Sequence, residues 1–185
     1  MIAKQRIGIV GAGMMGHGIA KNLVEKGFPL AVRGHRSRAP IDDLVGRGAT
    51  EVKTNADLAR ASDIVILCVT GAPQVEEVMF GPEGVAGAAR PGTIVVDTST
   101  SEPATTAKMR EALAKQDVRF VDAPLARTPV EAEQGRLNTM VGADDATFAE
   151  LKPVFAAYCE NIIHAGPAGH GIILKLINNF VAQAI

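Results

Sequence analysis

The chain has no tryptophan, one tyrosine and no excess of either charge, since its 185 residues carry 19 Lys and Arg against 20 Asp and Glu. A balanced charge excludes the basic surface that a nucleic acid or an acidic membrane requires. Few aromatic rings leave no stacking platform for unpaired bases. No apolar run approaches the roughly 20 residues of a membrane helix. We therefore expect neither nucleic acid nor a membrane as a partner.

Cysteine is also scarce. Cys68 and Cys159 lie far apart, without the spacing of metal ligands, and Cys68 falls in an apolar run typical of a core strand. We therefore expect no metal site. The apolar run at 7–10 is too short for the hydrophobic region of a signal peptide. The expected location is therefore cytoplasmic, by default and not by positive evidence.

Hydrophobic residues make up 47% of the chain and form short blocks that alternate with helical patterns. Continuous apolar strands bounded by turn residues are typical of a parallel sheet covered on both faces. The expected strands are 6–10, 29–32, 63–69, 93–97, 119–122 and 137–141, and the expected helices are 17–26, 54–62, 72–80, 103–116 and 144–158. This alternation predicts an α/β fold with a doubly wound, mainly parallel sheet.

The first expected strand leads into Gly11-Ala12-Gly13-Met14-Met15-Gly16 and then into a helical pattern. Strand, glycine turn and helix are the context of the dinucleotide-binding fingerprint of Rossmann-type domains. Gly11 permits a tight turn, Gly13 lets the backbone approach a pyrophosphate, and Gly16 lets the helix pack against the strand. The helix N-terminus would offer free N–H groups to the phosphates. All six residues are predicted to bind the cofactor; the alternative is a glycine-rich turn of an unrelated α/β domain.

The residues after the second expected strand indicate which dinucleotide is bound. An NAD site usually has Asp or Glu about 20 residues beyond the glycines, where it holds the ribose 2′-hydroxyl. This chain has His35, Arg36 and Ser37 there, and no acidic residue before Asp42. Arg36 can make a bidentate contact with a 2′-phosphate, and Ser37 can add a donor. NADP is therefore favoured over NAD; the alternative is a basic surface loop.

Ligands of doubly wound sheets bind at the carboxyl ends of the strands. The loops expected there contain Val69 and Thr70, then Ser99 and Thr100, then Arg127 and Thr128. The first four residues are predicted to contact the cofactor, and Ser99 also the substrate; alternatively, the hydroxyls of 98–101 only cap a helix. Arg127 and Thr128 present a guanidinium and a hydroxyl suited to an oxyanion. The alternative for Arg127 is a solvated surface side chain.

The final segment, 168–185, is expected to form a helix with one narrow polar stripe. Lys175, Asn178, Asn179 and Gln183 fall on one helical face, and every other position from Ile172 onward is apolar. Such a helix is expected to be buried on most sides, with its stripe lining a wet cleft. In that setting Lys175 is a candidate acid or base. The alternative is that the stripe is simply the solvated face.

Four ordered motifs resemble those of the β-hydroxyacid dehydrogenases, the family of 3-hydroxyisobutyrate dehydrogenase and tartronate semialdehyde reductase. They are the glycine loop followed by Asn22-Leu23, then Asp97-Thr98-Ser99-Thr100 with Pro103, then Asp122-Ala123-Pro124 with the run 135–142, and finally Gly169-His170-Gly171 with Lys175 and Asn179. The resemblance covers the length of the chain. It implies a Rossmann domain over 1–167, the start of an interdomain helix at 168–185, and a homo-oligomer.

The resemblance also implies roles for single residues. Lys175 would be the general acid in carbonyl reduction and the base in alcohol oxidation, and Asn179 would orient Lys175 or the substrate. Ser99 or Thr100 would lie near the nicotinamide, which exchanges a hydride with the carbonyl carbon. Asp122, at the start of the substrate motif, would contact the substrate.

Two features depart from the family pattern. The Ser-Gly-Gly that usually holds a substrate carboxylate is replaced by Ala126-Arg127-Thr128. This run resembles the sulfolactaldehyde reductase branch, in which the Arg serves a sulfonate, and Asn178 would help to hold the same anion. The expected substrate is therefore a sulfonated or otherwise anionic small aldehyde or β-hydroxyacid. The chain also ends within the helix that in the family continues into a helical domain, so its apolar face is expected to lack a partner.

Two other functions compete with this interpretation. One is an NADP-binding fragment without turnover, because catalysis needs a site that excludes water and holds its groups in place. The other is imine reduction, which similar proteins carry out. Lys175 argues against imine reduction, since those relatives tend to carry a different residue at this position.

Overall fold

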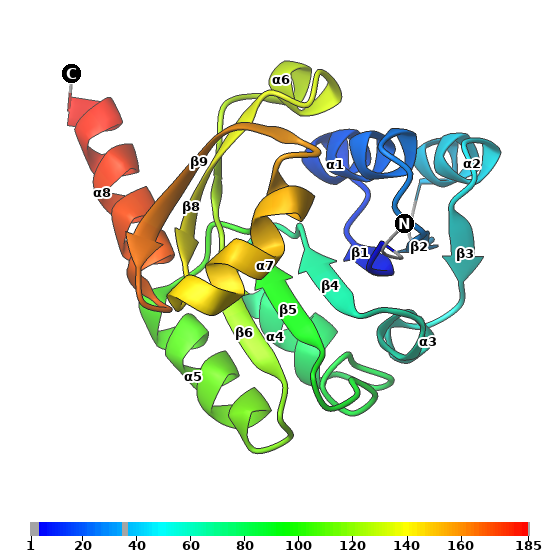
Figure 1. The fold of residues 1–185 in the computed structure, drawn as a ribbon, viewed down its shortest axis with the longest axis horizontal. Helices are drawn as coiled ribbons and strands as arrows, with labels where there is room; N and C mark the ends of the chain where they lie inside the picture. Colours follow the sequence, from blue (N-terminus) through cyan, green and yellow to red (C-terminus); the bar gives the residue numbers. More distant parts are fainter. Residues whose placement is uncertain (1–3, 35–36, 185) are drawn as a thin grey trace.

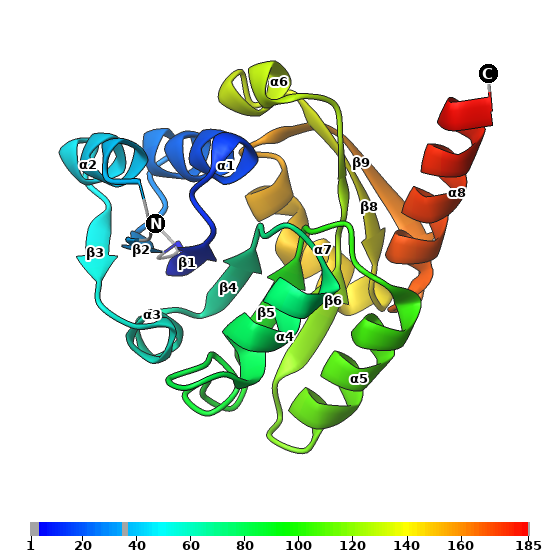
Figure 2. The same ribbon diagram turned by 180° about the vertical axis from the view of Figure 1, so that it is seen from behind.

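The computed structural model describes residues 4–34 and 37–184, which form one sheet with helices on both faces (Figures 1 and 2). The strands are β1 (Ile7–Val10), β2 (Leu30–Arg33), β3 (Thr50–Val52), β4 (Ile64–Leu67), β5 (Ile94–Asp97), β6 (Arg119–Asp122), β7 (Leu125–Ala126), β8 (Leu137–Gly142) and β9 (Cys159–Gly166). The helices are α1 (Met14–Glu25), α2 (Ala39–Gly46), α3 (Asn55–Ala61), α4 (Ala72–Phe80), α5 (Pro103–Ala114), α6 (Pro129–Glu133), α7 (Asp145–Phe155) and α8 (His170–Ala184).

Six strands run parallel in the order β3-β2-β1-β4-β5-β6. The direction of winding reverses between β1 and β4, and open sheets of this kind bind ligands outside the carboxyl ends of the strands at such a point. Beyond β6 the sheet becomes mixed, because β8 is antiparallel to β6 and β7 and parallel to β9. The expected doubly wound, mainly parallel sheet is confirmed.

The helices bury two apolar clusters, one on each face of the sheet. On one face the sheet is covered by α1, α2, α6 and α7, and on the other by α3, α4 and α5. Strands β1, β2, β4, β5 and β6 contribute side chains to both clusters. The central strands β1, β4 and β5 are buried at every position, which explains their continuous apolar sequences. Both faces of the sheet are therefore closed, and the strand ends remain as the place for a ligand.

Every expected strand and helix forms within a few residues of its predicted bounds, but five further elements were not expected. They are α2, β3, β7, α6 and β9. The helix expected over 144–158 ends at Phe155, and the chain then forms β9 against β8. These elements are short or partly exposed, so their sequences carry little of the apolar periodicity by which strands and helices are recognised.

Helix α8 forms as expected but, contrary to the prediction from the sequence, it is not buried on most sides. Lys175, on the polar stripe, is only 9% exposed, whereas Ile177 and Phe180, at apolar positions, are 54% and 74% exposed. The helix touches the sheet near its first turns and then extends away from it (Figures 1 and 2). Ile173 and Val181, also at apolar positions, are exposed as well. In the described residues no helix is long and apolar enough to cross a membrane.

Candidate active site

The glycine loop is tightly packed against the end of β4. Gly11 has a φ of +99°, and a Cβ there would lie 2.2 Å from the carbonyl oxygen of Cys68. A Cβ at position 16 would lie 1.8 Å from the carbonyl oxygen of Gly11. Neither oxygen belongs to a side chain that can turn away, so only glycine allows α1 to begin this close to β1 and β4.

Gly13 is different, because a Cβ at this position would meet nothing within 4 Å. Gly13 is the N-cap of α1, and in the part of the chain that the structure describes no side chain caps the helix or places an acidic group in its first turn. The first N–H groups of α1, which carry the positive end of the helix dipole, therefore have no capping side chain among the described residues. This arrangement suits a phosphate, as the sequence predicts.

The loops after β4 and β5 lie side by side. The backbone N–H of Val69 donates to Ser99 Oγ at 3.1 Å, and the Thr98 hydroxyl donates to the carbonyl of Leu67 at 2.7 Å. Ser99 is buried and Thr100 is exposed, as is Thr70 in the neighbouring loop. Four residues predicted to bind the cofactor are thus brought together at the carboxyl ends of adjacent strands.

Two buried carboxylates lie behind these loops. Asp97 and Asp122 are paired neighbours at the ends of β5 and β6. Asp97 Oδ1 accepts from the N–H of Ser99 at 2.9 Å, while Asp122 accepts from the N–H groups of Gly169 at 2.6 Å and Ile172 at 2.8 Å. Burial raises the pKa of Asp97 to about 6, and the nearby charge of Asp122 adds to the shift. Burial also raises the pKa of Asp122, against the opposing effect of the α8 N–H groups.

Lys175 lies one turn beyond Ile172 on α8. Burial lowers the pKa of its ammonium group from the usual 10.5. Asn179, one turn further, is half-buried, and Asn178 is exposed. The predicted polar stripe therefore becomes more exposed along the helix, with Lys175 as its buried end.

Arg127 and Thr128 already have partners within the protein. Arg127 donates to the carbonyl of Arg136 at 2.5 Å and forms an ion pair with Glu160 on β9. Thr128 caps α6, and Glu131 completes the capping box. Both side chains are therefore already bonded within the protein, and neither is free to bind an anion without giving up such a bond. Arg127 also adopts a φ of +84°, which is uncommon for a residue with a side chain.

The ribose loop is described only in part, because His35 and Arg36 lie outside the described residues. Ser37 is exposed. Arg38 bonds to Glu51 at 2.5 Å and to Asp42 at 2.7 Å, so its guanidinium is already occupied. Among the described residues, Nε of Arg33, at the end of β2, is buried without a hydrogen-bond partner.

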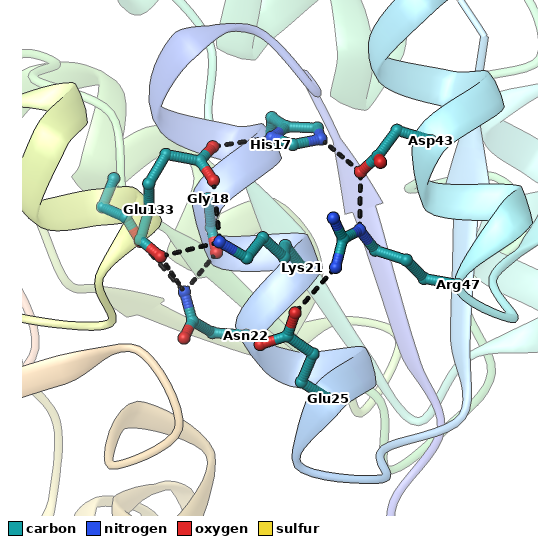
Figure 3. Close-up of polar contacts among 9 residues, drawn as sticks. His17, Gly18, Lys21, Asn22, Glu25, Asp43, Arg47 and Glu133 are labelled. Atoms are coloured by element: carbon teal, nitrogen blue, oxygen red, sulfur yellow. Dashed lines mark hydrogen bonds and ion pairs between the residues drawn. The ribbon is translucent and has the colours of Figure 1, made fainter.

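A polar network ties α6 to α1 and α2 (Figure 3). His17 places Nδ1 2.6 Å from Glu133 and Nε2 3.0 Å from Asp43, and Lys21 donates to Glu133 at 3.1 Å. Asn22 donates to the carbonyl of Ala132 at 3.0 Å. The helix that follows the Arg127 loop is thereby attached to the helix that begins at the glycine loop. In the described residues no group of acidic, Cys and His side chains is arranged to hold a metal ion.

Residues 6–166 match the family model of the NAD-binding domain of 6-phosphogluconate dehydrogenase. The chain belongs to this family. Binding of NAD(P) follows from the family and agrees with the uncapped start of α1.

Among curated relatives, the chain is 36% identical over 176 residues to 2-(hydroxymethyl)glutarate dehydrogenase of Eubacterium barkeri, covering 95% of this chain and 58% of the relative. It is 34% identical over 177 residues to 2-hydroxy-3-oxopropionate reductase of Escherichia coli, covering 95% and 60%. A structure of Mycobacterium tuberculosis 3-hydroxyisobutyrate dehydrogenase with L-serine is similar with a TM-score of 0.90 at 26% identity, covering 97% of this chain and 60% of that one. These names confirm the resemblance to the β-hydroxyacid dehydrogenases. The chain spans about three fifths of the length of the curated relatives it matches.

Asp97 belongs to one of the family motifs but is not among the predicted site residues, and the sequence does not predict the attachment of Asp122 to α8. A buried carboxylate at the end of an apolar strand was the signal available for both. The hydrogen-bond partners of both carboxylates, however, lie on other segments, and the sequence does not show that those segments pack against the ends of β5 and β6.

Proposed function

We propose that this chain binds NADP(H) and serves a reductase or dehydrogenase that acts on a small anionic aldehyde or β-hydroxyacid. The observation that carries the proposal is the uncapped start of α1 beside the joined loops of Val69 and Ser99, with buried Lys175 on a helix attached to the next strand. These are the parts that a hydride-transfer site needs: a place for the pyrophosphate, a polar wall for the nicotinamide and one proton donor.

Bound nicotinamide would supply the hydride to the carbonyl carbon or accept it from the alcohol carbon. Lys175 would give a proton to the carbonyl oxygen in reduction and remove it from the hydroxyl in oxidation. Its burial supports this role, because a lowered pKa brings an ammonium closer to the pH at which it can both give and take a proton. Asn179 would orient Lys175 or the substrate, and Ser99 would contact the nicotinamide and the reacting group.

The anion of the substrate would be held near Arg127, Thr128 and Asn178. Because Arg127 pairs with Glu160, this role requires the substrate to replace or share that partner. A sulfonate or a carboxylate would meet the same donors. A sulfonated aldehyde is the substrate class that the run 126–128 favours, and a carboxylated semialdehyde of equal length is the matched comparison.

The preference for NADP rests on Arg36 and Ser37. We expect Arg36→Ala to weaken the binding of NADPH at least about tenfold, or ~1.4 kcal/mol, while the binding of NADH changes little. Arg38→Ala is the matched control, since Arg38 is two residues away and already bonds to Glu51 and Asp42. Equal loss of NADPH and NADH in Arg36→Ala, or an equal effect of both substitutions, would contradict the assignment.

The deciding experiment is a fluorescence titration of the chain with NADPH and NADH, followed by addition of sulfonated, carboxylated and neutral aldehydes. Oxidation of NADPH that is faster with the anionic aldehydes supports the proposal. Cofactor binding without turnover supports the alternative of a cofactor-binding unit, and absence of binding overturns the whole assignment.

The exposed face of α8 supports a second proposal, that chains associate through Ile173, Ile177 and Phe180. These side chains are 45%, 54% and 74% exposed, and an apolar stripe of this kind tends to be covered by another surface. Sedimentation should then show association that falls when Ile177 and Phe180 are replaced by Gln. A monomer at high concentration would contradict this.

A further inference from the structure

The carboxylate of Asp122 belongs to β6 but bonds to the start of α8. It is only 2% exposed, and its two oxygens accept from the N–H groups of Gly169 and Ile172. Gly169 directly precedes α8 and Ile172 lies in its first turn, so no carbonyl of the same helix can reach either N–H group. The carboxylate therefore does the work of an N-cap side chain, although the sheet and not the helix supplies it.

Two glycines allow the helix to come this close. A Cβ at position 142 would lie 2.6 Å from Asp122 Oδ1, and a Cβ at position 171 would lie 2.3 Å from the carbonyl oxygen of Met140. Neither atom can move aside cheaply, because one is in a buried, doubly bonded carboxylate and the other is in the backbone of β8. The first turn of α8 is therefore held at a fixed distance from β6 and β8.

This attachment determines where Lys175 lies. Lys175 comes three residues after Ile172, so its position follows directly from the turn that Asp122 holds. Further along, α8 leaves the sheet, and Phe180 and Val181 are exposed (Figure 1). The second half of the helix therefore contributes little to its orientation, and the first turn carries most of it.

We propose that Asp122 is a positioning residue, which fixes the first turn of α8 and so sets the depth and direction of Lys175. The proposal rests on the proposed function in one respect, namely that Lys175 is the acid–base group. It gives Asp122 a different role from the substrate contact that the motif implies, because both carboxylate oxygens already bond to protein backbone.

The test compares Asp122→Asn with Asp144→Asn. Asparagine has one acceptor oxygen, and its NH₂ group would face an N–H donor, so it cannot replace the carboxylate at both α8 bonds. Asp144 caps α7 by accepting from the Thr147 N–H at 2.9 Å and the Thr147 hydroxyl at 2.8 Å. Both substitutions remove the negative charge of a carboxylate that caps a helix, but only Asp122→Asn does so at α8.

Two readouts are independent of turnover. Amide hydrogen exchange at 169–172 should become about tenfold faster in Asp122→Asn, and stay unchanged in Asp144→Asn. The pH dependence of Lys175 acetylation by acetic anhydride, followed by mass spectrometry, should move toward that of an exposed lysine such as Lys115 only in Asp122→Asn. Where turnover is measurable, kcat should fall at least about tenfold, with the KM for the cofactor little changed.

Exchange at 169–172 and Lys175 acetylation that match the wild type in Asp122→Asn would overturn the proposal. So would equal changes in Asp144→Asn, which would reveal a general loss of stability. A wild type without turnover on any aldehyde would contradict the proposed function instead, while the exchange and acetylation results would still decide the role of Asp122.

Discussion

Asp97 and Asp122 are paired neighbours on β5 and β6, and each carboxylate holds a different part of the candidate site. Asp97 bonds to the loop that carries Ser99, and Asp122 bonds to the helix that carries Lys175. The cofactor side and the proton-donor side are thus fixed from one place in the sheet. Two like charges buried this close raise each other's cost of ionisation.

This relationship predicts a pH-dependent stability. The pKa of Asp97 is raised to about 6 in the folded protein, while an unfolded Asp titrates near 3.9. Protonation of Asp97 therefore stabilises the folded protein. This stabilisation is fully present below pH ~4 and is lost as the pH rises through ~6. Two pKa units correspond to about 3 kcal/mol of unfolding free energy.

Denaturant unfolding of the wild type and Asp97→Asn between pH 4 and pH 7 measures this effect. The asparagine keeps an acceptor for the Ser99 N–H but carries no charge, so its stability should fall less over this range. Parallel curves for the two proteins would show that the Asp97 charge contributes nothing.

The glycine loop predicts opposite outcomes for two similar substitutions. Gly16→Ala places a Cβ 1.8 Å from the Gly11 carbonyl oxygen, so it should lower stability toward the upper end of about 1–3 kcal/mol. Gly13→Ala places a Cβ in open space at a φ of −78°, so it should change stability by less than about 0.5 kcal/mol. Its methyl group would instead meet the pyrophosphate, and NADPH affinity should fall at least about tenfold.

Thermal unfolding and an NADPH titration on both variants separate these effects. Unchanged NADPH affinity in a folded Gly13→Ala protein would argue against pyrophosphate binding at this loop.

The sequence predicts the parts of this fold that have strong local patterns. The buried strands β1, β4 and β5 are apolar at nearly every position, and the glycine spacing fits only a close turn between strand and helix. The sequence does not predict the short elements, because β7 has two residues and α6 has five. Such segments form where neighbours hold them, as Glu133 and His17 hold α6 against α1.

Side-chain partners were harder to predict than backbone elements. Arg127 has the chemistry of an anion ligand, yet Glu160, more than 30 residues away, is its partner. The polar stripe of α8 was expected to line a cleft, and its first member, Lys175, is indeed the buried one. The rest of the helix is largely exposed. A local pattern shows which face of a helix is apolar, but it does not show which surface, if any, packs against that face.

A substitution of Lys175 should slow the chemical step and leave the binding of the cofactor intact. Lys175→Met keeps the length of the side chain and removes the proton donor, so kcat should fall by about 10²–10⁴-fold with NADPH affinity nearly unchanged. Because burial lowers the pKa of Lys175 from 10.5, the loss of reductase activity at alkaline pH should occur below that value. Activity retained in Lys175→Met would assign proton transfer to another group.

Asn22 predicts how the attachment of α6 to α1 responds to charge. Its Nδ2 donates to the carbonyl oxygens of Gly18 at 2.8 Å and Ala132 at 3.0 Å, and a Cβ at position 135 would lie 2.7 Å from its Oδ1. Asn22→Ala leaves the Ala132 carbonyl without this donor and should cost about 1–3 kcal/mol. Asn22→Asp is nearly the same size but sets a carboxylate oxygen against two carbonyl oxygens, so it should cost more than Asn22→Ala at neutral pH.

Lowering the pH should recover part of the stability lost in Asn22→Asp, because a protonated carboxyl can donate once. Denaturant unfolding at pH 4 and pH 7 measures the difference. An Asn22→Asp protein as stable as the wild type at pH 7 would mean that the Asn22 amide does not hold the two helices together.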